Sequence, residues 1–512
     1  MVGAVFLLGA LPTLAGCAVG PTFATPATPV LDKWRGAGDP RISTQNAADS
    51  LWWKAFNDPA LDRLVDLAHR QNLPLQVAGL RIVEARAQFG VATGLQFPQT
   101  QQLFASGEAV GLTEQVARYT QLPRNLLTYQ VGFDAAWELD FWGKYRRGVE
   151  AEGANLLASV ADYQAAFVSL TAEVARTYVA LRTAEVLIKQ AQDNARVQEE
   201  ALAIAKARFQ AGAVSELDPT QATALLESTR ASVPRFQIGL AQARNALNTL
   251  LGQPAGVEPL LTGPKEIPKP PAKVAVGVPA EMLRRRPDIR VAEMSAAAQC
   301  ARIGVAKAEL YPSFSLIGTI GLRALNKGTG SHNLFATSSV FYSIGPSINF
   351  PFFNYGRLVN GVRVEDARFQ QLLVSYRDTV LKAAQEVEDA LAGFLNSQQA
   401  MVFEQNAATA AARSVELALV QYREGASDYQ RVLDAQRSLL DQQQSLAQSS
   451  SSASTNLIAL YKALGGGWQL QQGQQVVPAE TRHQMEARTN WGGVLSSPRP
   501  PETANNPPPG QQ

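Results

Sequence analysis

The sequence predicts an α+β membrane protein in which a few β-strands cross a membrane, long α-helices extend from them, and the same plan occurs twice. Two observations support this prediction. Glycines recur at a common shift of 213 residues, at positions 143, 212 and 252 and again at 356, 425 and 465, which is typical of an internal duplication. Each copy also contains segments that alternate between apolar and polar residues, followed by a long run without proline.

The N-terminal 31 residues carry no charged side chain, and the apolar run Val5–Leu14 is too short to span a bilayer. The run ends in LAGC at residues 14–17, which resembles the lipobox of bacterial lipoprotein signals. That resemblance implies that residues 1–16 form a signal peptide, that Cys17 then carries a covalent lipid, and that residues 17–60 form a lipidated N-terminal segment. The alternative is a cysteine at the end of an ordinary apolar segment. The basic residue that usually precedes such a run is missing, which leaves the true start of translation open.

Four segments of about ten residues alternate between apolar side chains and small or polar ones, as strands do when their two faces meet different surroundings. They lie near residues 103–112, 128–139, 313–322 and 340–350. Together with the lipid signal, the pattern favours an outer-membrane β-barrel over a soluble sandwich, whose strands alternate in the same way. Because four strands cannot close a barrel and an open edge in lipid is costly, the strands must be shared among chains. Two chains would give eight strands and three would give twelve, and the spacing does not choose between them.

Two runs without proline, from Gly143 to Gly212 and from Gly356 to Gly425, are each long enough for a helix of about 100 Å. A shorter helical segment precedes each pair of strands, and another follows each long run. Two of these segments stacked end to end would match one long helix, so each copy could supply two columns of equal height to a tube. We therefore expect a first repeat over residues 61–265 and a second over 266–470, each in the order helix, two strands, long helix, short helix. Residues 471–512 are rich in Gln, Pro and Asn, which predicts a disordered tail.

Composition and motifs exclude several other classes of function. The chain has 46 Lys and Arg against 44 Asp and Glu, a net charge of +2, so no basic surface is expected to hold a nucleic acid. It lacks the G-x-S-x-G, H-E-x-x-H, C-x-x-C and phosphate-loop signatures, and its histidines, His69, His332 and His483, are scattered. We expect no enzyme activity, no metal, and no cofactor other than the lipid on Cys17.

Five segments together resemble a known family: CAVGP from Cys17, WWKAFNDPALDRLV from Trp52, RRRPDIRVAE from Arg284, IGVAKAELYPSFSLIGTIG from Ile303 and YREGASDYQRVLDAQRSLL from Tyr422. In this order and spacing they resemble the bacterial outer membrane efflux proteins of TolC type. The resemblance is to the lipoprotein branch (NodT/OprM-like) that serves resistance-nodulation-division pumps, and it covers residues 17–470.

The resemblance implies a homotrimer whose twelve strands form an outer-membrane β-barrel, which a helical barrel continues into the periplasm. It implies a passive duct that exports drugs or other small toxic molecules and docks, through a periplasmic adaptor, onto an inner-membrane resistance-nodulation-division pump. Two alternatives remain open: an outer-membrane duct of a protein secretion system, and a pore-less coiled-coil lipoprotein that spaces the outer membrane from a periplasmic partner.

The turns after the long helices carry the expected docking residues. Gly212 and Gly425 stand where a helix ends most easily in a left-handed residue. Ser215 with Asp218 has the spacing of a capping box for the next helix, and Asp428 or the serine before it is suited to cap the helix in the second copy. These hairpins should form the periplasmic mouth. The resemblance makes the adaptor-docking tips Gly212, Ser215, Gly425 and Ser427.

Three residues match the family's gating tyrosine, aspartate and arginine by the resemblance: Tyr422, Asp434 and Arg437. An aspartate at one height in each of three chains would favour cations in a narrow pore, and charge-assisted hydrogen bonds among the helix ends would hold the pore shut until an adaptor binds. The alternative is a surface helix pair of Asp434 and Arg437, worth about 0.2–0.5 kcal/mol. Some relatives carry a second aspartate where this chain has Arg431. The first copy has no like residues at the shifted positions, so the gate is expected in the second copy alone.

Overall fold

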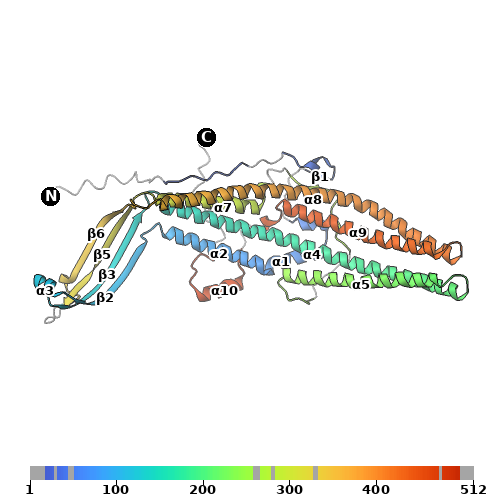
Figure 1. The fold of residues 1–512 in the computed structure, drawn as a ribbon, viewed down its shortest axis with the longest axis horizontal. Coiled ribbons are helices and arrows are strands. Elements are labelled where there is room, and N and C mark those ends of the chain that lie inside the picture. The colour runs from blue at the N-terminus through green and yellow to red at the C-terminus, as the bar shows by residue number, and fades with distance from the viewer. Residues whose placement is uncertain are drawn as a thin grey trace.

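The chain is elongated, with a β-sheet at one end and two helical hairpins at the other (Figure 1). This computed structural model describes residues 18–27, 32–43, 51–257, 266–277, 283–326, 333–471 and 475–495. Within these ranges no helix has both the length and the apolar character needed to cross a membrane. Strands therefore form one end of the molecule, and helices form the other.

Four antiparallel strands form the sheet, in the order β2 (Thr100–Gly111), β3 (Asn125–Leu139), β5 (Ser313–Asn326) and β6 (Val340–Asn349). They lie where the alternation in the sequence predicted them. The short helix α3 (Glu114–Thr120) follows β2 at the far end of the sheet. β2 and β6 each have a neighbouring strand on one side only, so they are the edges of the sheet.

The two faces of the sheet differ in polarity, because successive side chains along a strand point to opposite faces. One row in register across the sheet consists of Leu103, Phe133, Ile320 and Tyr342, all of them exposed. The adjacent row, on the other face, consists of Gln102, Asp134, Thr319 and Ser343. We call these two sides the apolar face and the polar face.

Two helices of 67 residues, α4 (Lys144–Gln210) and α8 (Arg357–Arg423), run the length of the helical part. At 1.5 Å per residue each spans about 100 Å, as predicted. Shorter helices pack along them: α2 (Leu73–Gly94) and α5 (Leu217–Leu250) on α4, and α7 (Pro287–Ala308) and α9 (Tyr429–Ala463) between α4 and α8. The helices therefore form four columns, and these follow the same order as the four strands.

The two short helices of a column meet end to end, as predicted, at a joint. The side-chain amide of Asn72 donates to the carbonyl oxygen of Leu250 at the end of α5, at 2.9 Å, and its Oδ1 accepts from Leu75 N in the first turn of α2, also at 2.9 Å. In the second joint, Arg286 just before α7 donates from Nη1 to the carbonyl oxygen of Ala463 at the end of α9, at 2.7 Å. Polar side chains thus occupy both joints.

The main core lies near the joints, where the N-terminal segment packs on the helices. Trp52 and Trp53 are each 1% exposed, and the ring of Trp52 stacks on Tyr461 of α9 at 5.3 Å between centroids. Asp58 caps α1 (Pro59–Gln71) and also accepts a hydrogen bond from the Tyr178 hydroxyl of α4 at 2.8 Å. A parallel pair of two-residue strands, β1 (Ile42–Ser43) and β4 (Val274–Ala275), ties the N-terminal segment to the segment between α5 and α7. The tryptophan pair and Asp58 therefore join α1, α4 and α9.

The C-terminal segment forms a short helix, α10 (Ala479–Arg488), beside α2. Met485 and Leu495 are buried in a small cluster with Val83 of α2. Gly79 of α2 permits a close approach, because a Cβ there would lie 2.3 Å from the carbonyl oxygen of Val476. The predicted disorder is therefore wrong for residues 475–495, since a few widely spaced apolar side chains are enough to hold the segment on one helix. The rest of the predicted tail, apart from residue 471, lies outside the described residues.

His69 of α1 is expected to make the stability of the core depend on pH. Its ring stacks on Phe167 of α4 at 3.9 Å, its Nε2 lies 2.8 Å from Thr171 Oγ1, and burial lowers its pKa to about 4. Because the unfolded chain takes up this proton near pH 6.5, the free energy of unfolding should fall as the pH drops from about 6.5 toward 4. His69→Gln should flatten that fall in thermal melts across this range. His483→Gln is the matched control, since its side chain is 81% exposed. An unchanged slope in H69Q would contradict the role of His69.

Candidate functional site at the helical tips and the helix–sheet junction

The two long hairpins end in turns of the same form. Gly212 after α4 has a φ of 71° and Gly425 after α8 has a φ of 79°, in the left-handed region that glycine adopts at helix ends. The residue after each glycine donates its N–H back to a helical carbonyl oxygen, at 2.9 Å in the first turn and 2.8 Å in the second. Both predicted helix-ending turns are therefore confirmed.

The start of the next helix differs between the two hairpins. α5 begins at Leu217, and Ser215 Oγ lies 3.4 Å from Leu217 N. The predicted capping box of Ser215 and Asp218 does not form, because the Asp218 side chain points to another partner, described below. In the second hairpin Asp428 caps α9 by accepting a backbone N–H at 3.4 Å, and Ser427 Oγ donates to the Asp428 carbonyl oxygen at 3.4 Å.

Tyr422, in the last turn of α8, is fully buried in a cluster that ties the two hairpins together. Its hydroxyl donates a hydrogen bond to Asp218 Oδ2 of α5 at 2.9 Å. The guanidinium of Arg208 in α4 lies 4.7 Å from the centroid of the Tyr422 ring and donates to the Tyr422 carbonyl oxygen. The ring of Tyr429, the first residue of α9, lies 5.1 Å from that of Tyr422. We call these four residues the tip cluster, to which α4, α5, α8 and α9 each contribute one.

The tip cluster keeps one protonation state near neutral pH. Burial, together with the hydrogen bond to Asp218, raises the pKa of the Tyr422 hydroxyl. Burial raises the pKa of Tyr429 to about 12. Both hydroxyls therefore stay protonated, and Tyr422 remains a donor to the Asp218 carboxylate.

The other two predicted gate residues lie apart from the tip cluster. Asp434 and Arg437 are exposed on α9, and Asp434 Oδ1 accepts a hydrogen bond from Gln430 Nε2 at 2.9 Å. Among the described residues no ion pair joins Asp434 to Arg437, so the surface pair considered as an alternative is not formed. The structure therefore does not bring the three predicted gate residues into one group.

Three members of the tip cluster were missed by the sequence analysis. Arg208 and Asp218 lie 214 and 204 residues before Tyr422, in the first half of the chain. Tyr429 is one of several aromatic residues that could have been core. The signal that could have found them is their position beside Gly212 and Gly425. Both hairpins were expected to form the periplasmic mouth. Polar residues beside the turn at Gly212 were therefore candidates to contact polar residues beside the turn at Gly425.

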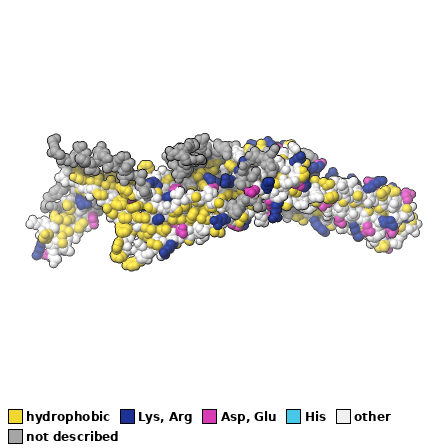
Figure 2. All heavy atoms as spheres, turned by 90° about the horizontal axis from the view of Figure 1, so that it is seen from above, with side chains coloured by type: hydrophobic (Ala, Val, Ile, Leu, Met, Phe, Trp, Pro, Cys, Tyr) yellow, Lys and Arg dark blue, Asp and Glu magenta, His cyan; other side chains and the backbone are white. Residues whose placement is uncertain are grey.

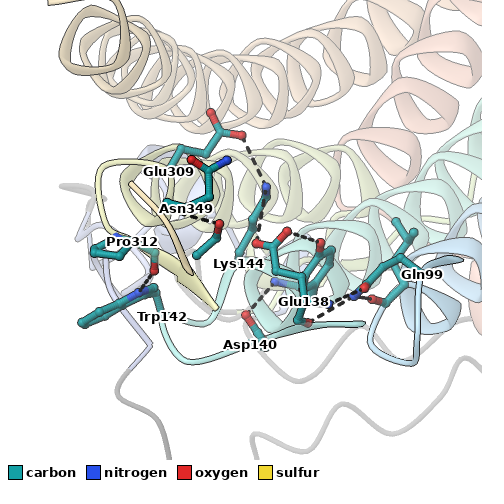
Figure 3. A network of polar contacts seen from close by, with 11 residues as sticks. Gln99, Glu138, Asp140, Trp142, Lys144, Glu309, Pro312 and Asn349 are labelled. Carbon is teal, nitrogen blue, oxygen red and sulfur yellow. Dashed lines mark hydrogen bonds and ion pairs between the residues drawn. The ribbon is translucent and has the colours of Figure 1, made fainter. Parts of the chain in front are cut away.

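A second group of polar residues holds the sheet to the helices (Figure 3). Lys144 Nζ, at the start of α4, lies 3.9 Å from a carboxylate oxygen of Glu138 in β3 and 3.8 Å from one of Glu309 after α7. Trp142 Nε1 donates to the carbonyl oxygen of Pro312 before β5 at 2.8 Å. These contacts join the two halves of the chain at the base of the sheet, so the strands and the helices are held in one orientation there.

The first described residues, 18–20, pass close to two glycines at this junction, Gly143 and Gly304. The N–H of Val19 donates to the carbonyl oxygen of Trp142 at 3.0 Å. A Cβ on Gly304 of α7 would lie 2.9 Å from the Val19 carbonyl oxygen, and one on Gly143 would lie 2.7 Å from the Cβ of residue 18. The hydrogen bond and the two glycine contacts thus hold the chain just after Cys17 at the base of the sheet. Cys17 itself, the predicted lipid attachment site, lies outside the described residues, as does the predicted signal peptide.

Neither region has the residues of a metal centre. Across the described ranges, no group of three or more His, Cys, Asp or Glu side chains is placed to hold a metal ion. His69 lies in the core and His483 on α10, and Cys300 is buried. His332 lies outside the described residues. What the tips and the junction offer is hydrogen bonding between helices and between sheet and helices.

Known proteins resemble this chain over most of its length. The family model described as Outer membrane efflux protein matches residues 64–253 and again residues 278–466. The chain is 31% identical over 457 residues to the cation efflux system protein CusC of Escherichia coli O6:H1, covering 89% of this chain and 97% of that protein. It is 33% identical over 469 residues to outer membrane protein OprJ of Pseudomonas aeruginosa, covering 89% and 94%.

Solved structures share the fold. The outer-membrane channel OprN matches with a TM-score of 0.82 at 34% identity, over 88% of this chain and 100% of that one. The open state of the Neisseria gonorrhoeae MtrE outer membrane channel matches with a TM-score of 0.76 at 30% identity, over 88% and 99%. These relatives are channels, which supports the prediction that the chain is not an enzyme. The chain belongs to the outer membrane efflux protein family and is an outer-membrane channel of an efflux system.

Proposed function

We propose that three copies of the chain close into one duct that passively exports drugs or other small toxic molecules from the periplasm to the exterior. The observation that carries this proposal is that the sheet and the helices leave free edges on the same two sides. β6 and α8 form one edge, and β2 with α2 and α5 forms the other. Joining unlike edges by rotation closes a ring and supplies every edge strand with a partner.

Exposed apolar side chains on both helical edges support ring closure. On α8, Val374 and Phe403 are 56% and 64% exposed, and on α2, Leu73 and Val91 are 61% and 67% exposed. Large apolar side chains gathered on opposite edges are expected where copies meet. Figure 2 shows hydrophobic side chains gathered over the sheet and the adjacent helices, whereas charged side chains are scattered over the tips.

Family membership favours three copies. Three chains would supply twelve strands, which close into a barrel with the polar face inward and the apolar face toward lipid.

We also propose that the chain is an internal duplication. Both halves contain a strand pair followed by a helix of 67 residues and a shorter one, in the same order.

The proposed trimer can be tested by its mass. Light scattering of the purified protein in detergent should give three times the mass of one mature chain.

We propose that the tips dock on a periplasmic adaptor, which joins the duct to an inner-membrane resistance-nodulation-division pump. Gly212, Ser215 and Gly425 are exposed at the end of the molecule farthest from the sheet, and Ser427 is half-buried there. Different relatives of the chain are named for the efflux of cations, of toluene and of antibiotics, which fits a duct that does not select its cargo by tight binding.

Co-purification of the protein with a drug-pump adaptor would support the proposed docking. A secretion ATPase would favour the protein-secretion alternative, and a lack of any conductance would favour the pore-less spacer.

We propose that Cys17 carries the lipid that anchors the mature chain to the outer membrane. The contacts with Gly143 and Gly304 support this, because they hold the residues just after Cys17 at the base of the sheet. Acyl chains contribute about 0.8 kcal/mol per buried methylene, so several on one residue anchor a protein stably. Mass spectrometry should show an acylated N-terminal cysteine, lost in Cys17→Ala and kept in Cys300→Ala. An unmodified Cys17 in protein from outer membranes would contradict the proposal.

We propose that the periplasmic gate has two parts. The tip cluster, through Tyr422, Asp218 and Arg208, holds the two hairpins of one chain together. Asp434 and Arg437 are exposed on α9, so they are available to a neighbouring copy. The gate thus combines links within a chain and charged links between chains.

Asp434→Ala is expected to raise the single-channel conductance in planar bilayers and to lower the preference for cations. A ring of carboxylates at a narrow mouth favours cations, and its charge-assisted hydrogen bonds favour the closed state. Glu480→Ala on α10 changes the net charge equally but lies far from the tips (Figure 1), so its current should match the wild type. Unchanged current and ion preference in D434A would count against this part of the gate.

A further inference from the structure

Two phenylalanine side chains lie on the polar face of the sheet, between two polar rows. Phe104 of β2 and Phe341 of β6 stand in one register row with Gly132 of β3 and Gly321 of β5. The row on one side holds Gln102, Asp134, Thr319 and Ser343, and the row on the other side holds Ser106, Gln130 and Arg323. A large apolar ring is favoured on the face toward lipid, so its presence between two polar rows calls for another cause.

The two glycines let both rings lie against the sheet. A Cβ on Gly132 would lie 2.7 Å from Cζ of Phe104, and a Cβ on Gly321 would lie 2.9 Å from Cε1 of Phe341. Each ring therefore extends from an edge strand over the glycine of the neighbouring strand. Both phenylalanines are half-buried, so part of each ring stays open on the polar face. The row presents aromatic surface without projecting far from the strands.

Opposite charges flank this aromatic row. On one side, the guanidinium carbon of Arg323 lies 4.8 Å from the centroid of the Phe341 ring, and the guanidinium donates to Gln130 Oε1 at 3.1 Å. The Phe341 ring thus already receives a cation on its face. On the other side, Asp134 accepts hydrogen bonds from Thr319 Oγ1 at 2.7 Å and from Gln102 Nε2 at 3.4 Å.

The partners of Asp134 are both neutral, so within the described residues no ion pair compensates its charge. An aromatic ring face and an uncompensated carboxylate both attract cations. The carboxylate stands one row from the rings, about 7 Å along the strand. That separation fits a molecule that carries a planar ring system and a positive charge.

We propose that Phe104, Phe341 and Asp134 form a contact surface inside the duct for planar aromatic cations on their way out. The ring system of such a molecule stacks on the Phe104 ring and against the part of the Phe341 ring that Arg323 leaves open, and its charge faces Asp134, away from Arg323. This inference rests on the proposed function, because the polar face lines a water-filled passage only when copies close into a duct. It deepens that function by naming a class of cargo for the strand region, away from the tips.

Block of the channel current separates this role from a purely structural one, in which the rings only cover the glycines. Ethidium is a planar aromatic cation, and tetraethylammonium is a cation without rings. On single channels carrying potassium current, we expect ethidium to block at about fivefold lower concentration than tetraethylammonium. The double variant Phe104→Leu with Phe341→Leu keeps an apolar cover over the glycines and should lose this difference. Asp134→Asn keeps the size of the side chain and one acceptor oxygen for Thr319 but removes the charge, so it should weaken the block by both cations.

The outcomes distinguish the inference from the proposed function. No current from the wild-type protein would overturn the duct itself, and this inference with it. A normal current that both cations block equally, or ethidium block in the double variant within about twofold of the wild type, would overturn the contact surface alone. Phe104→Leu by itself gives the same comparison if the double variant does not assemble. Wild-type block by both cations in D134N would remove Asp134 from the surface.

Discussion

Replacing Tyr422 by alanine is expected to raise the single-channel conductance of the reconstituted protein well above that of the wild type. The change removes a fully buried ring, leaves Asp218 without the hydroxyl that donates to it, and leaves Arg208 without the ring face over which it lies. Leaving one partner of a buried hydrogen bond unpaired costs about 1–3 kcal/mol, and because the hydrogen bond to Asp218 is part-buried, the lower end of that range applies. In the proposed trimer the loss occurs at the same height in every copy. The hairpins should separate more often, so planar-bilayer recordings should show larger or longer openings.

Two milder variants test which atoms of the tip cluster matter. Tyr422→Phe removes only the hydroxyl that donates to Asp218, so it should give an intermediate conductance. Tyr429→Phe keeps the second ring of the cluster and should conduct like the wild type. If Tyr422→Ala also conducted like the wild type, the tip cluster would not be what holds the mouth closed.

Phe394→Ala is expected to destabilise the folded chain by about 3–5 kcal/mol, the cost of truncating a buried phenylalanine in a close-packed core. Phe394 lies on α8 in the main core and is 0% exposed. Its thermal midpoint should therefore fall clearly below that of the wild type. Phe335→Ala is the matched control, because Phe335 lies between β5 and β6 and is 77% exposed. Equal midpoints for the two variants would show that the core near the joints does not limit stability.

The long helices and the strands could be predicted because each depends on a local pattern repeated over many residues. Runs without proline between Gly143 and Gly212, and between Gly356 and Gly425, allow uninterrupted helices, and α4 and α8 fill them almost completely. The strands could be predicted from the alternation of apolar and polar residues alone. The same kind of pattern did not predict the helix α10, because Met485 and Leu495 are too widely spaced to form one and are buried only by contact with α2.

The tip cluster could be predicted only in part, for a different physical reason. The resemblance identified Tyr422, but its partner Asp218 lies 204 residues away and depends on how two hairpins pack. The spacing of Asp434 and Arg437 suggested a local pair, yet Asp434 bonds Gln430 one turn earlier on the same helix instead. Local spacing identifies which side chains could meet, and the packing of distant helices decides which ones do.

The four helical columns differ as mechanical parts. α4 and α8 are continuous rods, whereas the columns of α2 with α5 and of α7 with α9 are jointed at Asn72 and at Arg286. A rod of uninterrupted backbone hydrogen bonds resists bending, whereas at each joint the ladder of backbone hydrogen bonds is broken and side chains bridge the gap. If the proposed gate opens, we expect the jointed columns to adjust at these breaks. We expect the strands, held to the helices at the junction, to keep their arrangement meanwhile.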